Sequence, residues 1–320
     1  MSDRLRVCIT GINGFVGKHF VRHLISDGVL ITGTGRKKNP PYSLPDLSYL
    51  SCNLLDYDET VRLIRDSNYD YVIHLAAENR VLPPGEQSLS TIKTNVFGTL
   101  NLLDALRAHT PTRLKGILII GSAHEYAISA ESGDQPLAED HPVAPFNLYG
   151  WSKHLQTLIA QRYAQLYDLP TMIARTFNLV GPGTDRGLSA EWAKQTVEIE
   201  KNVRPPVLRA GNINVARDFL DVRDAVRAYW QLLQAKNVPP GTLVNVCSGR
   251  ATQLEDILSL FQKHSRTPFR IETDPTKIRE KDPPSIRGSN QRLNQLTGWT
   301  PSIPLIRSVT DLLEEYRNTL

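Results

Sequence analysis

Short apolar runs alternate with stretches of helical periodicity along the first 180 residues of the chain. The apolar runs predict strands at 5–9, 29–32, 71–75, 116–121 and 171–174. Between them, apolar residues recur at three- and four-residue spacing, which predicts helices over 16–24, 56–64 and 92–106 and another from near Gly150 to 166. Strands joined by helices form parallel βαβ units, and strands that are apolar throughout are covered on both faces. The pattern therefore predicts an α/β core built on a doubly wound parallel sheet.

The alternation of strands and helices becomes irregular after about residue 180. Proline and glycine interrupt the chain at 181–183, 204–206 and 238–241, and the remaining helices are expected near 222–235, 254–263 and 306–317. These shorter elements predict a smaller C-terminal lobe. Ligands of open α/β sheets bind beyond the carboxyl ends of the strands, so a lobe at that edge would close over a ligand.

Composition excludes several classes of protein. The chain has 320 residues, of which 40% are hydrophobic, and 37 basic against 33 acidic residues give a net charge of +4, so it is neither disordered nor basic enough to indicate nucleic-acid binding. No apolar run approaches the roughly 20 residues of a membrane span, and no secretory leader is recognised. Three widely spaced cysteines suit a reducing compartment, so we expect a cytoplasmic protein with no membrane or nucleic-acid partner.

The histidines and cysteines show no metal-site spacing, so no metal is expected. His74 is interpreted as a structural residue at the end of a strand. His19, His23 and His109 are expected on solvated faces of helices.

A glycine turn lies between the first strand and the first helix. Gly11, Gly14 and Gly17 allow a tight turn, close approach of the backbone to a pyrophosphate, and close packing of the helix. The N-terminus of the following helix offers free N–H groups and a partial positive charge to phosphates. In this strand–turn–helix context the motif predicts a Rossmann-type dinucleotide site, with a purely structural turn as the alternative.

The end of the second strand distinguishes the two nicotinamide cofactors. An acidic residue there would bind a ribose 2′-hydroxyl, whereas an arginine accommodates a 2′-phosphate. Residues 33–38 contain Arg36, Lys37 and Lys38 and no carboxylate. NADP(H) is therefore favoured, with Arg36 as a contact. NAD(H) remains possible, since a solvated basic loop would look the same.

Tyr149 and Lys153 are four residues apart at the start of a predicted helix, which places both side chains on one face. An ammonium group near a phenol lowers its pKa, and such a tyrosine can exchange a proton with a sugar oxygen while hydride moves to or from a nicotinamide. Ser122 follows the apolar strand 116–121, where its hydroxyl could bond the same oxygen. These three residues form the predicted catalytic set.

With these motifs the chain resembles the extended short-chain dehydrogenase/reductase family, in the branch that modifies nucleotide sugars. The resemblance covers nearly the whole chain and is closest to GDP-4-keto-6-deoxymannose reductases, then to GDP-mannose 4,6-dehydratases. The matching segments are 10–17, 74–77, 94–99, Ser122, Tyr149 with Lys153, 175–178, 181–183, 217–224, 245–249 and 298–301.

The resemblance implies roles for individual residues. Residues 1–180 and 218–246 would form the dinucleotide-binding domain, and 181–217 and 247–320 the nucleotide-sugar lobe. Glu78, Asn178, Arg217 and Arg279 would bind the substrate, although Arg217 could instead form a surface salt bridge and the sequence after Arg279 departs from the family. Asn53 stands where the family usually has Asp. The implied cofactor contacts are Gly11, Asn13, Gly14, Phe15, Val16, Gly17, Arg36, Asn53, Leu54, Leu75, Ala76, Ala77, Asn95, Tyr149 and Lys153.

The residues after Ser122 bear on the reaction. Dehydratases of this family carry a carboxylate there, whereas this chain has Ala123 and His124, and Glu125 would point to the other face of an extended segment. His124 could be an acid/base group or could simply line the pocket. The resemblance implies NAD(P)H-dependent reduction of the 4-keto group of a GDP-linked 4-keto-6-deoxyhexose. The alternatives are a 4,6-dehydratase or 4-epimerase with tightly bound cofactor, and a cofactor-binding regulator without catalysis.

Two helices carry more apolar residues than one buried stripe requires: the helix over 92–106 and the helix that bears Tyr149. The resemblance implies that they pair with a second copy of the chain in a homodimer. The alternative is that both helices only cover the sheet.

Overall fold

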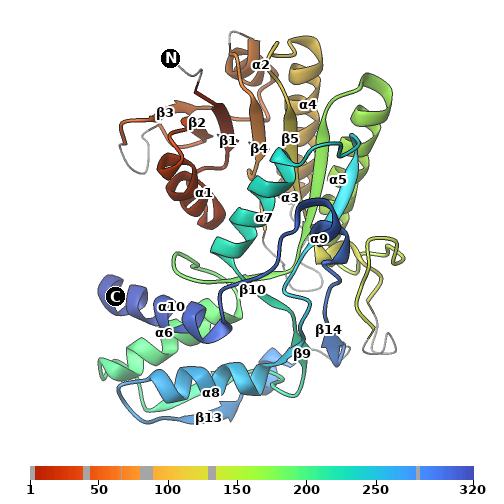
Figure 1. The fold of residues 1–320 in the computed structure, drawn as a ribbon. Coiled ribbons are helices and arrows are strands. Elements are labelled where there is room, and N and C mark those ends of the chain that lie inside the picture. Colours follow the sequence, from red (N-terminus) through yellow and green to blue (C-terminus); the bar gives the residue numbers. More distant parts are fainter. Residues whose placement is uncertain (1–3, 39–43, 66, 80–88, 129–134, 279–281) are drawn as a thin grey trace.

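A seven-stranded sheet forms the centre of the fold (Figure 1). The structure is a computed structural model, which describes residues 4–38, 44–65, 67–79, 89–128, 135–278 and 282–320. Every neighbouring pair of strands in the sheet is parallel. The doubly wound, Rossmann-type sheet expected from the sequence is therefore confirmed. The strands lie in the order β11 (Thr242–Val246), β6 (Thr171–Thr176), β5 (Gly116–Ser122), β4 (Tyr71–His74), β1 (Arg6–Thr10), β2 (Leu30–Gly35) and β3 (Leu47–Ser51).

Helices cover both faces of the sheet, which explains why its central strands are apolar throughout. On β1, Val7 and Ile9 pack in one cluster with α1 (Phe15–Ser26), α7 (Val222–Gln234) and α9 (Gln291–Thr297). Cys8, between them, packs in the opposite cluster with α2 (Tyr57–Arg65), α4 (Gly98–Ala108) and α5 (Leu148–Tyr167). Successive residues of a strand point to opposite faces, so both must be apolar here.

A smaller lobe has its own apolar core around Trp192, Phe261 and Leu312. It contains α6 (Leu188–Glu200), α8 (Leu254–His264) and α10 (Leu305–Thr319), with β8 (Val207–Ala210) paired to β13 (Arg270–Thr273). The chain enters this lobe from the end of β6 through β7 (Asn178–Val180), which pairs with β10 (Phe219–Asp221) (Figure 1). Further short strands are β9 (Ala216–Arg217), β12 (Thr252–Gln253) and β14 (Ser285–Ile286).

Several elements differ from the sequence expectations. The helix expected over 92–106 begins with a short α3 (Leu89–Ile92) and a π-helical turn, Lys93–Phe97, before α4. The expected division at residue 247 assigns α9 to the lobe, yet Leu293 and Trp299 pack in the core of the sheet. His19 is not solvated: it is buried, and its Nε2 lies 2.7 Å from the Pro182 carbonyl oxygen.

All three cysteines are buried and free. None of the helices in the described part of the chain combines the length and the apolar character that a transmembrane segment requires.

Asp224 on α7 joins the sheet to the segment that leads into α10. Its carboxylate is buried and accepts the backbone N–H groups of Ser302 and Ile303 and a bond from Arg227. Burial alone would raise the pKa of Asp224, but these donors outweigh it and hold the pKa below its ordinary value. The carboxylate therefore stabilises the fold at neutral pH, and this contribution is lost as the pH falls through the lowered pKa.

We expect Asp224→Ala to lower the free energy of unfolding by about 2–4 kcal/mol, because it removes a buried carboxylate that accepts several hydrogen bonds and leaves its donors without that acceptor. Urea unfolding at pH 7 measures the change. Asp256→Ala on the exposed side of α8 is the control and should cost less than about 0.5 kcal/mol. Equal midpoints for the two variants would contradict this role.

Candidate active site

The glycine turn packs directly against the end of β4. Gly11 has φ of +70°, and a Cβ placed on it would lie 2.6 Å from the Ala76 backbone nitrogen. A Cβ on Gly17 would lie 2.4 Å from the Ile12 carbonyl oxygen. Both positions therefore require glycine. The turn brings together two groups of predicted cofactor residues, at 11–17 and 75–77.

Gly14 is the N-cap of α1, and no side chain caps the helix there. The first turn, which includes Phe15 and Val16, carries no acidic residue that would compete with an anion for its N–H groups and for the partial positive charge of the helix. These residues could hold the diphosphate of a dinucleotide.

The residues expected near the adenosine end lie along the carboxyl ends of β2 and β3. Arg36 is exposed and follows Gly35, the last residue of β2. The loop is fixed from β3, because the Tyr49 hydroxyl donates to the Lys37 carbonyl (2.7 Å) and accepts from Asn13 Nδ2 (3.3 Å). Asn53 is exposed after β3, and the carbonyl of buried Leu54 accepts a hydrogen bond from the Asn101 side-chain amide. The Arg36 guanidinium is therefore placed at the end of the strand that decides between the two cofactors.

Asn95 lies in the π-helical turn and is fully buried. Its side-chain amide makes two hydrogen bonds with the backbone of Glu78: it accepts from the N–H at 2.7 Å and donates to the carbonyl at 2.9 Å. It also donates to the Ser152 hydroxyl, which in turn donates to the Tyr149 carbonyl. Asn95 therefore joins the segment after β4 to the first turn of α5, rather than pointing its amide into open space.

Ser122 and Tyr149 meet where β5 ends and α5 begins. Asn147 caps α5 by accepting the Gly150 N–H at 2.7 Å, and a Cβ on Gly150 would lie 2.3 Å from the His124 carbonyl oxygen, so the helix starts in close contact with the turn after Ser122. Burial raises the pKa of Tyr149 to about 12, and hydrogen bonding to the Ser122 hydroxyl lowers it only in part. The expectation of an unusually acidic phenol is therefore wrong for the protein alone.

Lys153 is buried below Tyr149, but its ammonium group points elsewhere. Nζ donates to the Ile120 carbonyl at 2.8 Å and to Gln156 Oε1 at 2.9 Å. Burial lowers the pKa of Lys153 to about 8. The four-residue spacing places both side chains on one face as expected, but the lysine is bound by two neutral oxygens, and desolvation dominates the pKa of each group.

A chain of buried hydrogen bonds runs from the glycine turn to Lys153. Thr10 Oγ1 lies 2.7 Å from His74 Nδ1, and His74 Nε2 lies 2.9 Å from Thr99 Oγ1, which also accepts from Gln156 Nε2 at 2.7 Å. Thr99 donates its own proton to the Asn95 carbonyl, so His74 must donate through Nε2 and accept through Nδ1.

The direction of these bonds defines the protonation state of His74. Burial lowers the pKa of His74 to about 3, with the positive charge of Lys153 adding to the effect, so the ring is neutral. Thr10 then donates to the ring and accepts the Ala76 N–H at 3.2 Å. His74 was predicted to be structural, and no role was predicted for Thr99 or Gln156. Thr99 lies in the matching segment 94–99, whereas no motif in the sequence indicated Gln156.

Residues 123–125 form a 3₁₀ turn, so the extended segment expected after Ser122 is wrong. The turn folds Glu125 back beneath Ser122, where Oε1 accepts the Ser122 N–H at 2.8 Å and Oε2 accepts from Arg175 at 2.9 Å. His124 instead faces the site: its ring lies 5.5 Å from that of Tyr149, edge to face, and its Nδ1 is 3.2 Å from Asn147 Nδ2.

The residues expected to bind substrate are further apart. Asn178 is exposed on β7 and donates to the Asp218 carbonyl at 2.9 Å. Arg217 on β9 donates to Asp282 at 2.5 Å and to the Pro283 carbonyl at 2.8 Å, so the salt bridge considered as its alternative is present, although it is partly buried rather than at the surface. Arg279 lies outside the described residues. Among those described, no three His, Cys, Asp or Glu side chains gather as a metal site would require.

The fold and the glycine turn define a class, the α/β proteins that bind dinucleotides. The family follows from comparison with known proteins: residues 7–247 match the model of the NAD dependent epimerase/dehydratase family. The chain belongs to this family, which confirms the resemblance to the extended short-chain dehydrogenases/reductases. Its members are NAD(P)-dependent enzymes that act on nucleotide sugars.

Individual relatives cover the whole chain. GDP-6-deoxy-D-mannose reductase of Pseudomonas aeruginosa is 31% identical over 98% of this chain and 97% of its own. The structure of RMD from the same organism, complexed with NADPH, superposes with a TM-score of 0.84 at 30% identity, covering 99% of this chain and 100% of that one. UDP-glucose 4-epimerase of Corynebacterium glutamicum is 23% identical over 96% of this chain and 94% of its own. The relatives therefore include both reductases and epimerases.

The environment of Lys153 makes a prediction that needs no substrate. We expect its ammonium group to titrate near pH 8, as the pKa of about 8 requires. Gln156→Glu places a negative charge beside Nζ and should raise this pKa, whereas Gln156→Leu removes an acceptor and should lower it. NMR of lysines labelled at Cε measures the titration. A Lys153 that titrates near 10.4 in all three proteins, as a solvated lysine does, would contradict the buried network.

Proposed function

We propose that this chain uses NADPH to reduce the 4-keto group of a nucleoside-diphosphate 4-keto-6-deoxyhexose, with a GDP-linked sugar as the substrate. The observation that carries the proposal is the pairing of Ser122 with a protonated Tyr149 where β5 ends and α5 begins. Reduction adds a proton to the carbonyl oxygen, so the phenol must carry that proton at neutral pH. A Tyr149 whose pKa is raised to about 12 is in that form.

Ser122, Tyr149 and Lys153 have different roles in the proposed reaction at the sugar oxygen. Ser122 donates a hydrogen bond that orients the keto oxygen, and Tyr149 gives its proton to the same oxygen as negative charge develops there. Lys153 carries a positive charge on the same face of α5 as Tyr149, and the bond to Gln156 keeps its ammonium group in place. The reduced nicotinamide, when bound at the glycine turn, supplies the hydride for C4 of the sugar.

Dehydration is less well supported by the residues around Ser122. Removal of water across C5 and C6 needs an acid/base group at those atoms. Ala123 offers none, and both oxygens of Glu125 are already engaged by the Ser122 N–H and Arg175. His124 packs against the Tyr149 ring, and we assign it to the wall of the pocket.

The choice of NADPH rests on Arg36, which follows β2 without a neighbouring carboxylate and can pair with a 2′-phosphate. The choice of a GDP-linked sugar rests on the similarity to GDP-6-deoxy-D-mannose reductase. For the substrate diphosphate we propose Asn178, Arg217 and Arg279, of which Arg217 would have to exchange its bond with Asp282.

The reaction is tested by mixing the protein with NADPH and GDP-4-keto-6-deoxymannose and following loss of the nicotinamide absorbance. Tyr149→Phe should lower kcat about 10²–10⁴-fold, because it removes the proton donor but keeps the aromatic ring and the other cofactor contacts. Tyr167→Phe, at the exposed end of the same helix, should keep full activity. NADPH binding followed by fluorescence should be equal in all three proteins.

Two further arms of this assay test the finer assignments. NADH in place of NADPH should lower kcat/KM at least about tenfold, which corresponds to loss of one charged contact. A UDP-linked keto sugar should react more slowly than the GDP-linked one. Activity on UDP-hexoses with no added reductant would instead identify a 4-epimerase, and failure to oxidise NADPH with any keto sugar would overturn the reductase proposal.

We also propose that the chain forms a homodimer through α4 and α5. Phe97 before α4 and Trp151, Leu155 and Leu158 on α5 are exposed to between 36% and 51%, and the two helices pack side by side. Several exposed large apolar side chains on two neighbouring helices are typical of a contact between proteins.

Light scattering should give a mass near twice the 35.9 kDa of one chain. Leu158→Glu should return the mass to that of one chain, because it places a charge in the apolar contact. Leu188→Glu changes a leucine that is also 41% exposed but lies on α6, and it should leave the dimer intact. A single-chain mass for the unmodified protein would exclude the dimer.

A further inference from the structure

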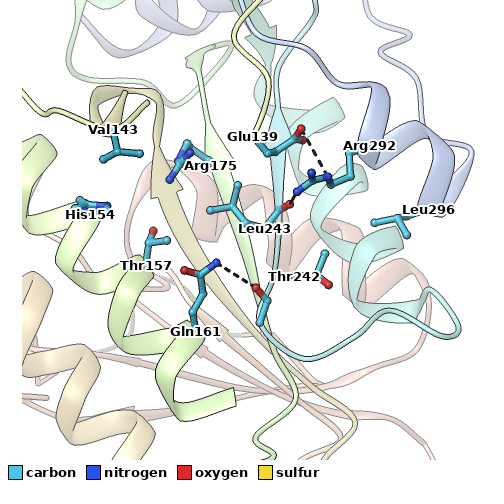
Figure 2. Close-up of a pocket in the computed structure, with 11 residues that line it drawn as sticks. Glu139, Val143, His154, Thr157, Gln161, Arg175, Thr242, Leu243, Arg292 and Leu296 are labelled. Atoms are coloured by element: carbon cyan, nitrogen blue, oxygen red, sulfur yellow. Dashed lines mark hydrogen bonds and ion pairs between the residues drawn. The ribbon is translucent and has the colours of Figure 1, made fainter. Parts of the chain in front are cut away.

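A cavity of about 500 Å³ lies at the β11 edge of the sheet, away from the glycine turn. Figure 2 shows its walls: α5 on one side, β6 and β11 beneath, and α9 on the other side. None of the proposed catalytic or cofactor residues lines it. The lining residues are Glu139, Val143, His154, Thr157, Gln161, Arg175, Gly241, Thr242, Leu243, Arg292 and Leu296.

Buried polar atoms without a hydrogen-bond partner gather in this cavity, although one of them, His154 Nδ1, lies 4.0 Å from Glu125 Oε2. Among the described residues nine buried side-chain nitrogen or oxygen atoms have no hydrogen-bond partner, and four of the nine belong to its lining: Arg175 Nε and Nη1, His154 Nδ1 and Thr157 Oγ1. The Arg175 side chain is only 3% exposed. Buried polar groups without partners are costly, so a cluster of them at one cavity points to a ligand that pairs with them.

The hydrogen-bonding character of these atoms indicates which groups a ligand must carry. Both unpaired nitrogens of Arg175 are donors, and Thr157 and His154 can each donate as well. The carboxylates nearby are already engaged: Glu125 accepts from Arg175 and the Ser122 N–H, and Glu139 accepts the Asn245 N–H. The ligand must therefore supply hydrogen-bond acceptors.

Two guanidinium groups at this cavity can bind an anionic acceptor, and each of them also has a carboxylate partner. Arg292 reaches the rim from α9, 47% exposed, with its Nε 3.8 Å from Glu139 (Figure 2). Val143, Leu243 and Leu296 form apolar walls that lower the local dielectric and strengthen charged contacts. Guanidinium groups bind carboxylate and phosphate oxygens through charge-assisted hydrogen bonds.

We propose that this cavity is a second ligand site, which binds the carboxylate or phosphate group of a small metabolite on Arg175, His154 and Thr157, with Arg292 at its entrance. The site is independent of the proposed reaction. It lies directly behind the candidate active site, however, because the same guanidinium donates from Nη2 to Glu125, whose other oxygen holds the Ser122 N–H. A bound oxyanion would hold Arg175 in place, and Arg175 in turn would hold the Glu125 carboxylate that binds the Ser122 N–H.

Calorimetric titration of the substrate-free protein at constant ionic strength tests the site, with inorganic phosphate in one arm and succinate in the other. Thr157→Val keeps the side-chain shape but removes one donor, and Arg292→Gln removes the charge at the entrance while keeping donors for Glu139 and the Leu243 carbonyl. Each should weaken binding of the preferred anion at least about fivefold.

Arg270→Gln is the matched control, because this arginine is 74% exposed on β13 and far from the cavity lining. It should bind the anion as the unmodified protein does, which separates the site from general effects of salt. Melting temperatures confirm that the variants are folded. No binding heat with either anion, or equal affinities in all four proteins, would overturn the proposal and leave the unpaired atoms to solvent.

Discussion

The buried hydrogen bonds through His74 connect the glycine turn to the helix of Tyr149. They cross from β1 to β4 and then to α4 and α5, so four elements distant in sequence share one network. Such a network stabilises only when each member is satisfied, and here the neutral tautomer of His74 makes every donor meet an acceptor. A protonated His74 would place an N–H donor against the Thr10 hydroxyl, which is itself the donor of this bond. The strongly lowered pKa of His74 keeps the ring neutral and so prevents this clash of two donors. The cofactor turn and the candidate catalytic lysine therefore hold their positions together.

Five of the seven strands were predicted, because the central strands are buried on both faces and read as continuous apolar runs. The edge strand β3 was missed for the opposite reason: its five residues, Leu47–Ser51, are exposed or half-buried, so polar residues interrupt the pattern. The buried strand β11 was not predicted, because Asn245 interrupts its short apolar run. The π-helical turn before α4 was also missed, since its apolar spacing resembles that of an ordinary helix. It turns Asn95 toward Glu78 and Ser152, which are distant in sequence.

In the site, spacing predicted which residues share a face, but it could not predict their partners. Lys153 and Tyr149 lie on one face of α5, yet the nearest acceptors of the ammonium are Gln156 and the Ile120 carbonyl, the latter 33 residues away. Glu125 was expected to point away from Ser122, and the 3₁₀ turn reverses it so that its carboxylate binds the Ser122 N–H. Both outcomes depend on burial and on long-range contacts, which a local pattern does not contain.

The buried pair of Glu125 and Arg175 explains how Ser122 is held. Removing two charges from water costs free energy, so a buried ion pair often stabilises a fold less than a hydrophobic contact of the same volume does. It is a good means of orientation, because the carboxylate fixes a backbone N–H at 2.8 Å while the guanidinium, stacked 4.3 Å above the Tyr126 ring, fixes the carboxylate. Nε and Nη1 of Arg175 have no hydrogen-bond partner among the described residues, so the anion proposed above would complete the set of bonds that this guanidinium makes. The cavity beside it is therefore the place where the orientation of Ser122 is open to influence from outside the active site.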